Sequence, residues 1–259
     1  MNDLLCPVDL SGAALVAADL ASDLARRTGG EVTLLHVTDR KEESEDAAAA
    51  LEAFRSRTNG QAPMRTLLRN GDFLEEIGLE SARGHALLVC GTHGARGLRQ
   101  TLLGADILKL IRRSAVPSMV VQEHSTTAFG NGPLVMPVSG HANTAPLLDA
   151  VCMLARLGGN SVQVYQIMRP GESPSDQLLE NKRKALYRLQ EEGIRHEEVN
   201  EPMQGFSVGF AMQTIAHAAR AGAACIAIMA HASDEYRWIA DAEKERLLTN
   251  EPGIPVLCV

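Results

Sequence analysis

The sequence predicts an α/β fold of two tandem, doubly wound domains, each with a five-stranded parallel sheet and helices on both faces. Short apolar segments alternate with helical patterns along the chain, which is typical of parallel sheets. The segments 87–90 and 224–229 are apolar without alternation, as expected for strands buried on both faces. The chain of 259 residues is also long enough for two domains of about 130 residues each.

The two halves of the chain repeat one plan at an offset of about 130 residues. In the first half, Pro7-Val8-Asp9 precedes a helical pattern, a Gly-Gly pair and a strand. In the second half, Pro137-Val138-Ser139 precedes the same series of features. The closing strands also correspond, at 115–121 and 253–259. This repetition indicates that both halves fold in the same way.

Each half is expected to run β-α-β-α-β-α-β-α-β. In the first half we expect strands at 3–8, 31–37, 63–69, 86–90 and 118–122, and helices at 12–27, 43–57, 73–83 and 105–113. In the second half we expect strands near 133–138, 161–168, 194–200, 224–229 and 255–259. The polar segment 125–132 is predicted to be a linker between domains at 1–124 and 133–259.

Composition narrows the function classes. The net charge is −7 and the isoelectric point is about 5.6, so the field of the protein repels nucleic acid and anionic membranes. The first residues carry no signal-peptide pattern, and no apolar segment approaches the ~18 residues that span a bilayer. We therefore expect a cytoplasmic protein that binds neither nucleic acid nor membrane.

Neither the cysteines nor the histidines form a metal-binding pattern. The five cysteines are scattered in apolar segments, without a C-x-x-C pair, and are expected to be buried packing residues. Redox sensing by Cys6 and Cys90, which could lie on neighbouring strands, is an alternative. The charged segment Lys182-Arg183-Lys184 is expected on the exposed surface of a helix.

A glycine-rich loop is the main candidate for a binding site. The strand at 86–90 is followed by Gly91-Thr92-His93-Gly94 and, ten residues later, by Gly104, a G-x2-G-x9-G spacing. Glycines let backbone N–H groups approach a ligand, and the next helix presents its positive end to an anion. If the first and fourth strands flank the point where the strand order reverses, Asp9 and this loop face one crevice.

At these residues the chain resembles the universal stress protein family in its tandem, two-domain form. The resemblance is carried by Pro7–Ser11, Leu34–Val37, Val89–Gly94, Gly104 and Pro117–Val121, which together cover the first domain. It implies an adenine nucleotide alpha hydrolase-like fold and a role in the stress response.

The resemblance also implies a site for ATP or AMP, with Mg²⁺ accompanying the nucleotide. Pro7, Val8, Asp9 and Val37 would hold the adenosine end, and the backbone at Cys90, Gly91 and Gly94 would hold ribose and phosphate. Gly104 and Ala105 would bind phosphates, while His93 either contacts the ligand or faces solvent. No catalytic residue and no protein-held metal is expected.

The first domain departs from the family pattern at the phosphate end. Ala105 stands where the phosphate-binding form has Ser or Thr, and Ile107 replaces a frequent hydroxyl residue. Asp106 lies between them, where it either caps the helix or repels a triphosphate. A lost hydrogen bond to a charged group costs about 1.5–3 kcal/mol, so AMP is favoured over ATP relative to intact members.

The second domain is expected to be degenerate and structural. Ser139 replaces Asp9, and the segment 230–235 contains no glycine. Its expected role is to supply the partner surface of an intrachain pseudo-dimer through the terminal strands at 119–121 and 256–258. A homodimer is an additional expectation.

Three functions remain open from the sequence. The first is regulatory adenine-nucleotide binding without efficient catalysis. The second is an interaction or adaptor module, with an unknown protein partner and vestigial sites. The third is a slow ATPase.

Overall fold

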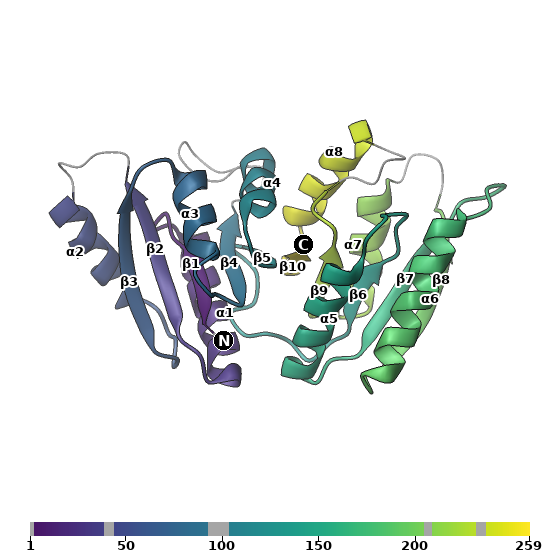
Figure 1. Cartoon of the computed structure of the whole chain (residues 1–259), viewed down its shortest axis with the longest axis horizontal. Helices are drawn as coiled ribbons and strands as arrows, with labels where there is room; N and C mark the ends of the chain where they lie inside the picture. The colour runs from purple at the N-terminus through teal and green to yellow at the C-terminus, as the bar shows by residue number, and fades with distance from the viewer. Residues whose placement is uncertain (1–2, 39–43, 93–103, 205–208, 232–236) are drawn as a thin grey trace. The chain divides into compact units, whose positions relative to one another are not determined.

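The computed structural model describes residues 3–38, 44–92, 104–204, 209–231 and 237–259. The chain divides into two compact units, Met1–Phe129 and Gly130–Val259, here called unit 1 and unit 2. Within each unit helices alternate with parallel strands, and the predicted α/β class is confirmed (Figure 1). None of the helices in the described ranges is long and apolar enough to cross a membrane.

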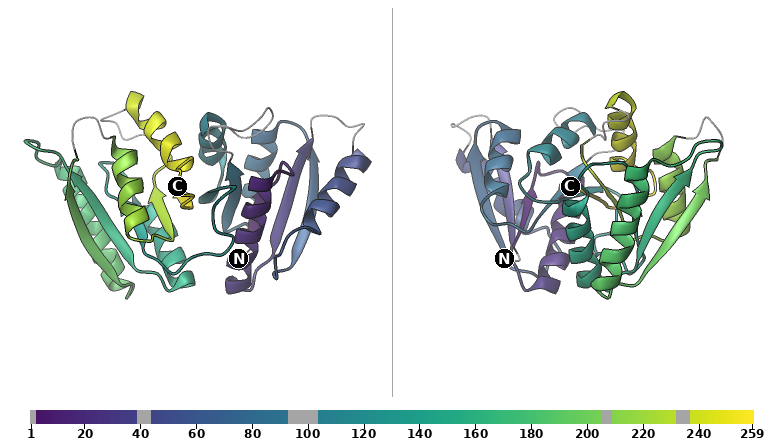
Figure 2. Two further views of the ribbon diagram at one scale, coloured as in Figure 1. Left: turned by 180° about the vertical axis from the view of Figure 1, so that it is seen from behind. Right: turned by 45° about the vertical axis from the view of Figure 1, so that its right-hand side comes forward.

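Unit 1 is a five-stranded parallel sheet with the order β3-β2-β1-β4-β5. Its elements are β1 (Leu4–Pro7), α1 (Gly12–Thr28), β2 (Val32–Thr38), α2 (Ser44–Arg55), β3 (Met64–Asn70), α3 (Phe73–Ser81), β4 (Leu87–Thr92), α4 (Gly104–Arg113) and β5 (Ser118–Gln122). Helices α3 and α4 cover one face of this sheet and α1 the other, as the front and rear views show (Figures 1 and 2). β1 and β5 are buried along their whole length because helices cover both faces.

Unit 2 repeats the arrangement with the order β10-β9-β6-β7-β8. Its elements are β6 (Leu134–Pro137), α5 (Ala145–Gly158), β7 (Val162–Met168), α6 (Asp176–Glu191), β8 (His196–Pro202), α7 (Phe210–Arg220), β9 (Cys225–Ile228), α8 (Arg237–Leu248) and β10 (Val256–Cys258). β8 begins and ends two residues later than expected.

The two units share local geometry at an offset of 130 residues. The N–H of Val8 donates to the carbonyl of Leu35 at 2.8 Å, and the N–H of Val138 donates to that of Tyr165 at 2.8 Å. Gly29 ends α1 with φ 68°, and its counterpart Gly159 ends α5 with φ 67°. This left-handed conformation favours glycine, so the same residue type closes both helices.

The segment after β5 is tied to α1 within unit 1. The carboxylate of Asp23 accepts the N–H of Phe129 at 3.0 Å, and Arg27 donates to the Phe129 carbonyl at 2.8 Å. The Arg27 guanidinium also lies 6.0 Å from the centre of the Phe129 ring, whose residue is 3% exposed. These contacts hold Phe129 against the helix.

Candidate functional site

The strand order of unit 1 reverses between β1 and β4, which are neighbours in the sheet. Leu4 pairs with Leu87 and Leu5 with Leu88, so the continued register brings Asp9 to the end of β1 beside the end of β4. The expectation that the first and fourth strands flank the reversal is therefore confirmed. Ligands of open α/β sheets bind beyond the strands' carboxyl ends at such a point.

The turn from β1 to α1 carries the exposed carboxylate of Asp9. Its Oδ1 accepts hydrogen bonds from the N–H of Ser11, at 3.1 Å, and from the Ser11 hydroxyl. Ser11 in turn caps α1 by accepting from the N–H of Ala14 at 3.2 Å. Leu10, between them, has φ 64°, a conformation that costs a non-glycine residue about 1–3 kcal/mol. The turn is thus held in a strained form that places the Asp9 carboxylate in solvent.

The end of β2 lies next to this turn. His36 approaches the carbonyl of Val8 with its Nδ1 at 2.7 Å, and because a carbonyl only accepts, Nδ1 carries the hydrogen. Val37 is half-buried at the same strand end. Pro7 and Val8 are buried, so they would position neighbouring residues of a site at this edge and not contact a ligand with exposed side chains.

Gly91 lies inside β4, where its Cα is in register with Val121, and not in the loop that the sequence predicted. A Cβ at this position would stand 2.4 Å from the carbonyl carbon and oxygen of Ala13 and 2.8 Å from the N of Ala14. Glycine is therefore required here for the close packing of α1 on β4. A larger residue at 91 would displace the helix, whether or not a ligand is bound.

Cys90 and Cys6 are fully buried on the neighbouring strands β4 and β1, as predicted. Burial raises the pKa of the Cys90 thiol to about 12 and that of Cys6 well above its usual value, the latter reinforced by Cys90 itself. A raised pKa disfavours the reactive thiolate. Both cysteines are packing residues in this structure, which speaks against redox sensing.

The phosphate end of the predicted site is described only in part. His93 and Gly94 lie outside the described residues, and Gly104 and Ala105 form the first residues of α4. The Asp106 carboxylate pairs with Lys109 at 2.9 Å and is half exposed. Ile107 is fully buried, so a hydroxyl at this position would sit in the core of unit 1.

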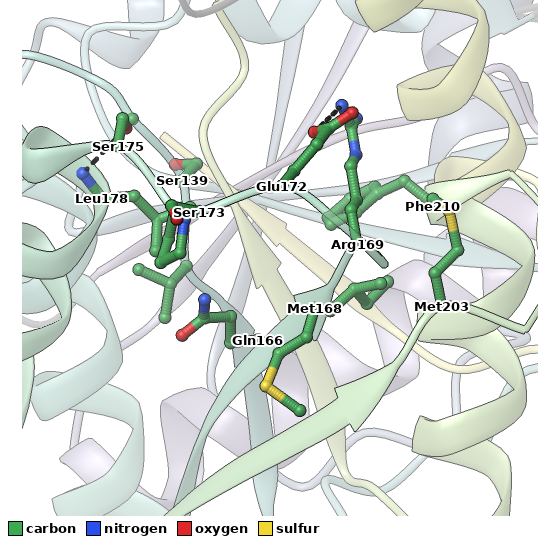
Figure 3. A pocket seen from close by; sticks show the side chains of 14 residues that line it. Ser139, Gln166, Met168, Arg169, Glu172, Ser173, Ser175, Leu178, Met203 and Phe210 are labelled. Atoms are coloured by element: carbon green, nitrogen blue, oxygen red, sulfur yellow. Dashed lines mark hydrogen bonds and ion pairs between the residues drawn. The ribbon is translucent and has the colours of Figure 1, made fainter.

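Unit 2 contains a pocket of about 540 Å³ at the ends of β6, β7 and β8 (Figure 3). It is lined by Val138, Ser139, Gly140, Gln166, Ile167, Met168, Arg169, Glu172, Ser173, Pro174, Ser175, Leu178, Met203 and Phe210. Sequence reasoning missed this pocket because its wall is assembled from several separate segments, and the β7–α6 loop, which supplies five of the lining residues, carries no motif. The repeat offset was the available signal, since it aligns Ile167 with Val37.

The turn after β6 is held by polar contacts that differ from those of unit 1. The Ser139 hydroxyl bonds Nδ1 of His141 at 2.6 Å, and the Asn181 amide donates to the carbonyls of Ser139 and His141, each at 2.8 Å. Asn181 is buried on α6, so this helix fixes the turn. No carboxylate takes the place of Asp9.

A polar cluster lies on β7, β8 and α7 of unit 2. Glu201 accepts hydrogen bonds from the Tyr165 hydroxyl at 3.0 Å and from Arg220 at 2.9 Å, and contacts Nδ1 of His217 at 3.0 Å. Burial by itself raises the pKa of Glu201, but the hydrogen bonds from His217, Tyr165 and Arg220 outweigh it and hold the pKa below its usual value.

In the ranges that the structure describes, no three His, Cys, Asp or Glu side chains gather into a group that could hold a metal ion.

Comparisons with known proteins point to one family. The universal stress protein family model matches residues 1–122, whereas no curated protein matches the chain. A universal stress protein from Archaeoglobus fulgidus DSM 4304 is similar in structure, with a TM-score of 0.68, 16% identity, and coverage of 99% of this chain and 97% of that chain.

Two further solved structures are similar to this chain. The protein PA1789 from Pseudomonas aeruginosa PAO1, of unknown function, has a TM-score of 0.62, 18% identity, and coverage of 100% of this chain and 92% of that chain. A universal stress protein in complex with cAMP covers 47% of this chain and 97% of that chain, with 20% identity and a TM-score of 0.40. The likenesses to the two long chains extend the shared fold over both units.

Proposed function

We propose that unit 1, whose residues 1–122 match the universal stress protein family, is a regulatory adenine-nucleotide-binding domain without efficient catalysis. The observation that carries the proposal is the exposed Asp9 carboxylate at the strand-order reversal, held by Ser11 beside the end of β4. A carboxylate accepts hydrogen bonds from ribose hydroxyls or from an exocyclic amine. The half-buried Val37 at the neighbouring strand end supports an apolar wall for the base.

The proposal favours AMP over ATP, with a smaller penalty for ATP than the sequence suggested. Asp106 is half exposed and paired with Lys109, so solvent and the lysine screen its charge from a phosphate. Ala105 still lacks the hydroxyl of the family pattern, so one hydrogen bond to the phosphates is missing. Mg²⁺ belongs to the proposal only as a companion of the nucleotide phosphates.

Nucleotide binding is not extended to unit 2. Ser139 stands where unit 1 has Asp9, and the residue equivalent to Gly91 is Met229, because Cys225 pairs with Leu134 as Leu87 pairs with Leu4. The role in the stress response follows from the family and is part of the same proposal.

Calorimetry with ATP, AMP and cyclic AMP, each with and without MgCl₂, tests this function. We expect saturable heat, with AMP tighter than ATP. Asp9→Asn keeps an acceptor for Ser11 but removes the charge, and should weaken binding about tenfold, since hydrogen bonds to charged groups exceed neutral ones by about 1.4 kcal/mol. Ser139→Ala is the matched control in unit 2 and should leave the heat unchanged.

Two outcomes distinguish the alternatives. Absence of heat with every nucleotide would reject the proposal and favour the interaction module. Phosphate release above background that Asp9→Asn abolishes would instead identify a slow ATPase. Gly91→Val is unsuitable as a binding probe, because the side chain would collide with α1.

A further inference from the structure

The pocket of unit 2 has the size and lining of a small-molecule site. Its volume of about 540 Å³ falls within the roughly 300–1,000 Å³ of typical ligand pockets. Half of the lining side chains are apolar, among them Ile167, Leu178, Met203 and Phe210, which come from four different elements or their ends. Methionine side chains adapt to irregular ligands, so Met168 and Met203 favour accommodation of a bulky apolar group.

Gln166 supplies a hydrogen-bond donor inside this lining. Its side chain is on β7, and the residue is 6% exposed. The Nζ of Lys182 donates to Gln166 Oε1 at 2.8 Å, and because an ammonium group only donates, the atom facing it must be the amide oxygen. The amide N–H₂ is therefore fixed on the other side of the group, where Figure 3 shows the nitrogen turned toward the other lining residues.

Lys182 is itself held firmly, so the Gln166 amide has one orientation. The Nζ of Lys182 also donates to Asn200 Oδ1 at 2.7 Å and forms an ion pair with Glu198, and the lysine is 9% exposed. Within the described ranges, no protein acceptor lies in hydrogen-bond contact with the Gln166 amide nitrogen. This nitrogen is not among the fully buried atoms without a partner, so water reaches it, and an acceptor atom of a ligand can take the place of that water.

The charges around the pocket cancel. Arg169 and Glu172 supply the charged side chains of the lining and pair with each other at 3.3 Å on the rim. Two hydroxyls of the lining already have partners, since Ser139 bonds His141 and Ser175 caps α6 through the N–H of Leu178. The lining therefore favours a ligand without net charge, because no unpaired charge is present to compensate for its desolvation.

We propose that unit 2 binds an uncharged, largely apolar small molecule in this pocket, with the Gln166 amide N–H₂ donating to a carbonyl oxygen or ring nitrogen of the ligand. This site is independent of the nucleotide site proposed for unit 1, and either can fail without the other. It differs from that site by having Ser139 in place of the Asp9 carboxylate and Met229 in place of Gly91.

The test uses the full chain with ¹³C-methyl methionine and coumarin as the probe, an uncharged bicyclic lactone with one carbonyl. NMR should show saturable shifts of the Met168 and Met203 methyl signals, while Met64 and Met119 of unit 1 stay unchanged. 2H-chromene, which lacks the carbonyl, should bind about tenfold more weakly, the loss expected for one hydrogen bond of about 1.4 kcal/mol.

The variant Gln166→Glu isolates the donor. It keeps an oxygen for Lys182 but replaces the amide nitrogen, so coumarin should lose its advantage over chromene. Gln190→Glu makes the same chemical change on the exposed face of α6 and should behave as wild type. Leu178→Trp, whose larger side chain fills the pocket, should abolish the methyl shifts caused by both probes. This variant tests the proposal if Gln166→Glu does not fold.

Three outcomes would overturn the proposal. One is unchanged Met168 and Met203 signals up to the solubility limit of coumarin. Another is an undiminished coumarin preference in folded Gln166→Glu. The third is a saturable shift of the same methyl groups by AMP or ATP, which would make the pocket a nucleotide site.

Discussion

The turn that leads from the first strand to the first helix differs between the two units, although the strands before it are alike. Both strands end in proline, followed by a valine whose N–H bonds the next strand at 2.8 Å. In unit 1 the helix α1 begins at Gly12, two residues after the strained Leu10. In unit 2 the helix α5 begins at Ala145, three residues later on the repeat offset of 130.

The residue that faces this turn from the central strand accounts for the difference. Because Gly91 has no Cβ, the backbone of Ala13 and Ala14 fills the space where a Cβ would lie. In unit 2 the equivalent position is occupied by Met229. A side chain at 229 is incompatible with a first helical turn in the same place. Gly91 therefore permits the earlier start of α1, while Pro146 in the first turn of α5 favours the later start in unit 2.

The largest expected effect comes from placing a methyl group in the tight contact. Gly91→Ala should reduce the free energy of unfolding by about 3 kcal/mol, because its Cβ overlaps backbone atoms that cannot move aside easily. Urea unfolding measures this. Met229→Ala, at the equivalent position, should cost only about 1 kcal/mol. Equal stability of Gly91→Ala and wild type would remove the explanation for the earlier start of α1.

Lys182 offers the next largest effect, because its counterpart in unit 1 is the surface residue Glu52. Lys182→Met leaves the oxygens of Gln166 and Asn200 without their donor and Glu198 without its ion pair, which should cost about 2–3 kcal/mol. The exposed Lys184→Met on the same helix is the control and should leave the urea midpoint in place. A neutral Lys182→Met would mean that the orientation of Gln166 does not depend on this cation.

The cluster around Glu201 should make unit 2 sensitive to acid, whereas unit 1 has Arg69 at the equivalent position, because Glu201 pairs with Ile167 as Arg69 pairs with Val37. Because the folded protein lowers the pKa of Glu201, its stabilising contribution is complete above the usual carboxyl pKa of about 4.3. That contribution disappears as the pH falls through the lower pKa of the folded state. Glu201→Gln should therefore flatten the acid limb of a plot of urea midpoint against pH. An unchanged acid limb would assign the acid sensitivity to other carboxylates.

The smallest effect is expected at Asp106. Asp106→Asn should strengthen ATP binding to unit 1 by no more than a few-fold, since an exposed charge paired with Lys109 is well screened. Calorimetry at low and high salt measures this, and the gain should shrink as salt is added. A gain that salt does not alter would indicate that the carboxylate lies closer to the phosphates than its exposure suggests.

The sequence predicted the strands of unit 1 well because buried parallel strands are continuous apolar segments between turn residues. It ended β4 at Cys90, because Gly91 was assigned to a glycine-rich loop, yet the strand continues through Gly91 and Thr92, which pair in register with Val121 and Gln122. The sequence also did not reveal that Gly91 is needed for packing, because the residue whose backbone it contacts, Ala13, is far away in the chain.

The surroundings of the unit 2 pocket could not be predicted from local sequence patterns. Lys182 lies in a charged segment, and the sequence predicted an exposed helix surface; this is correct for Arg183 and Lys184 but wrong for Lys182. The lysine is buried because three oxygen acceptors from β7 and β8 meet it, and none of them is adjacent in sequence. These acceptors come together only when the sheet has folded, so the local sequence around Lys182 contains no periodic pattern that would reveal its burial.

The attachment of Phe129 to α1 bears on how the chain can be dissected. The segment that matches the family ends at residue 122, but Asp23 and Arg27 bind the backbone of a residue seven positions further on. A fragment cut at the family boundary would leave the Asp23 carboxylate and the Arg27 guanidinium without these contacts. Anyone who isolates the N-terminal half for crystallisation or titration should therefore let it run through residue 129.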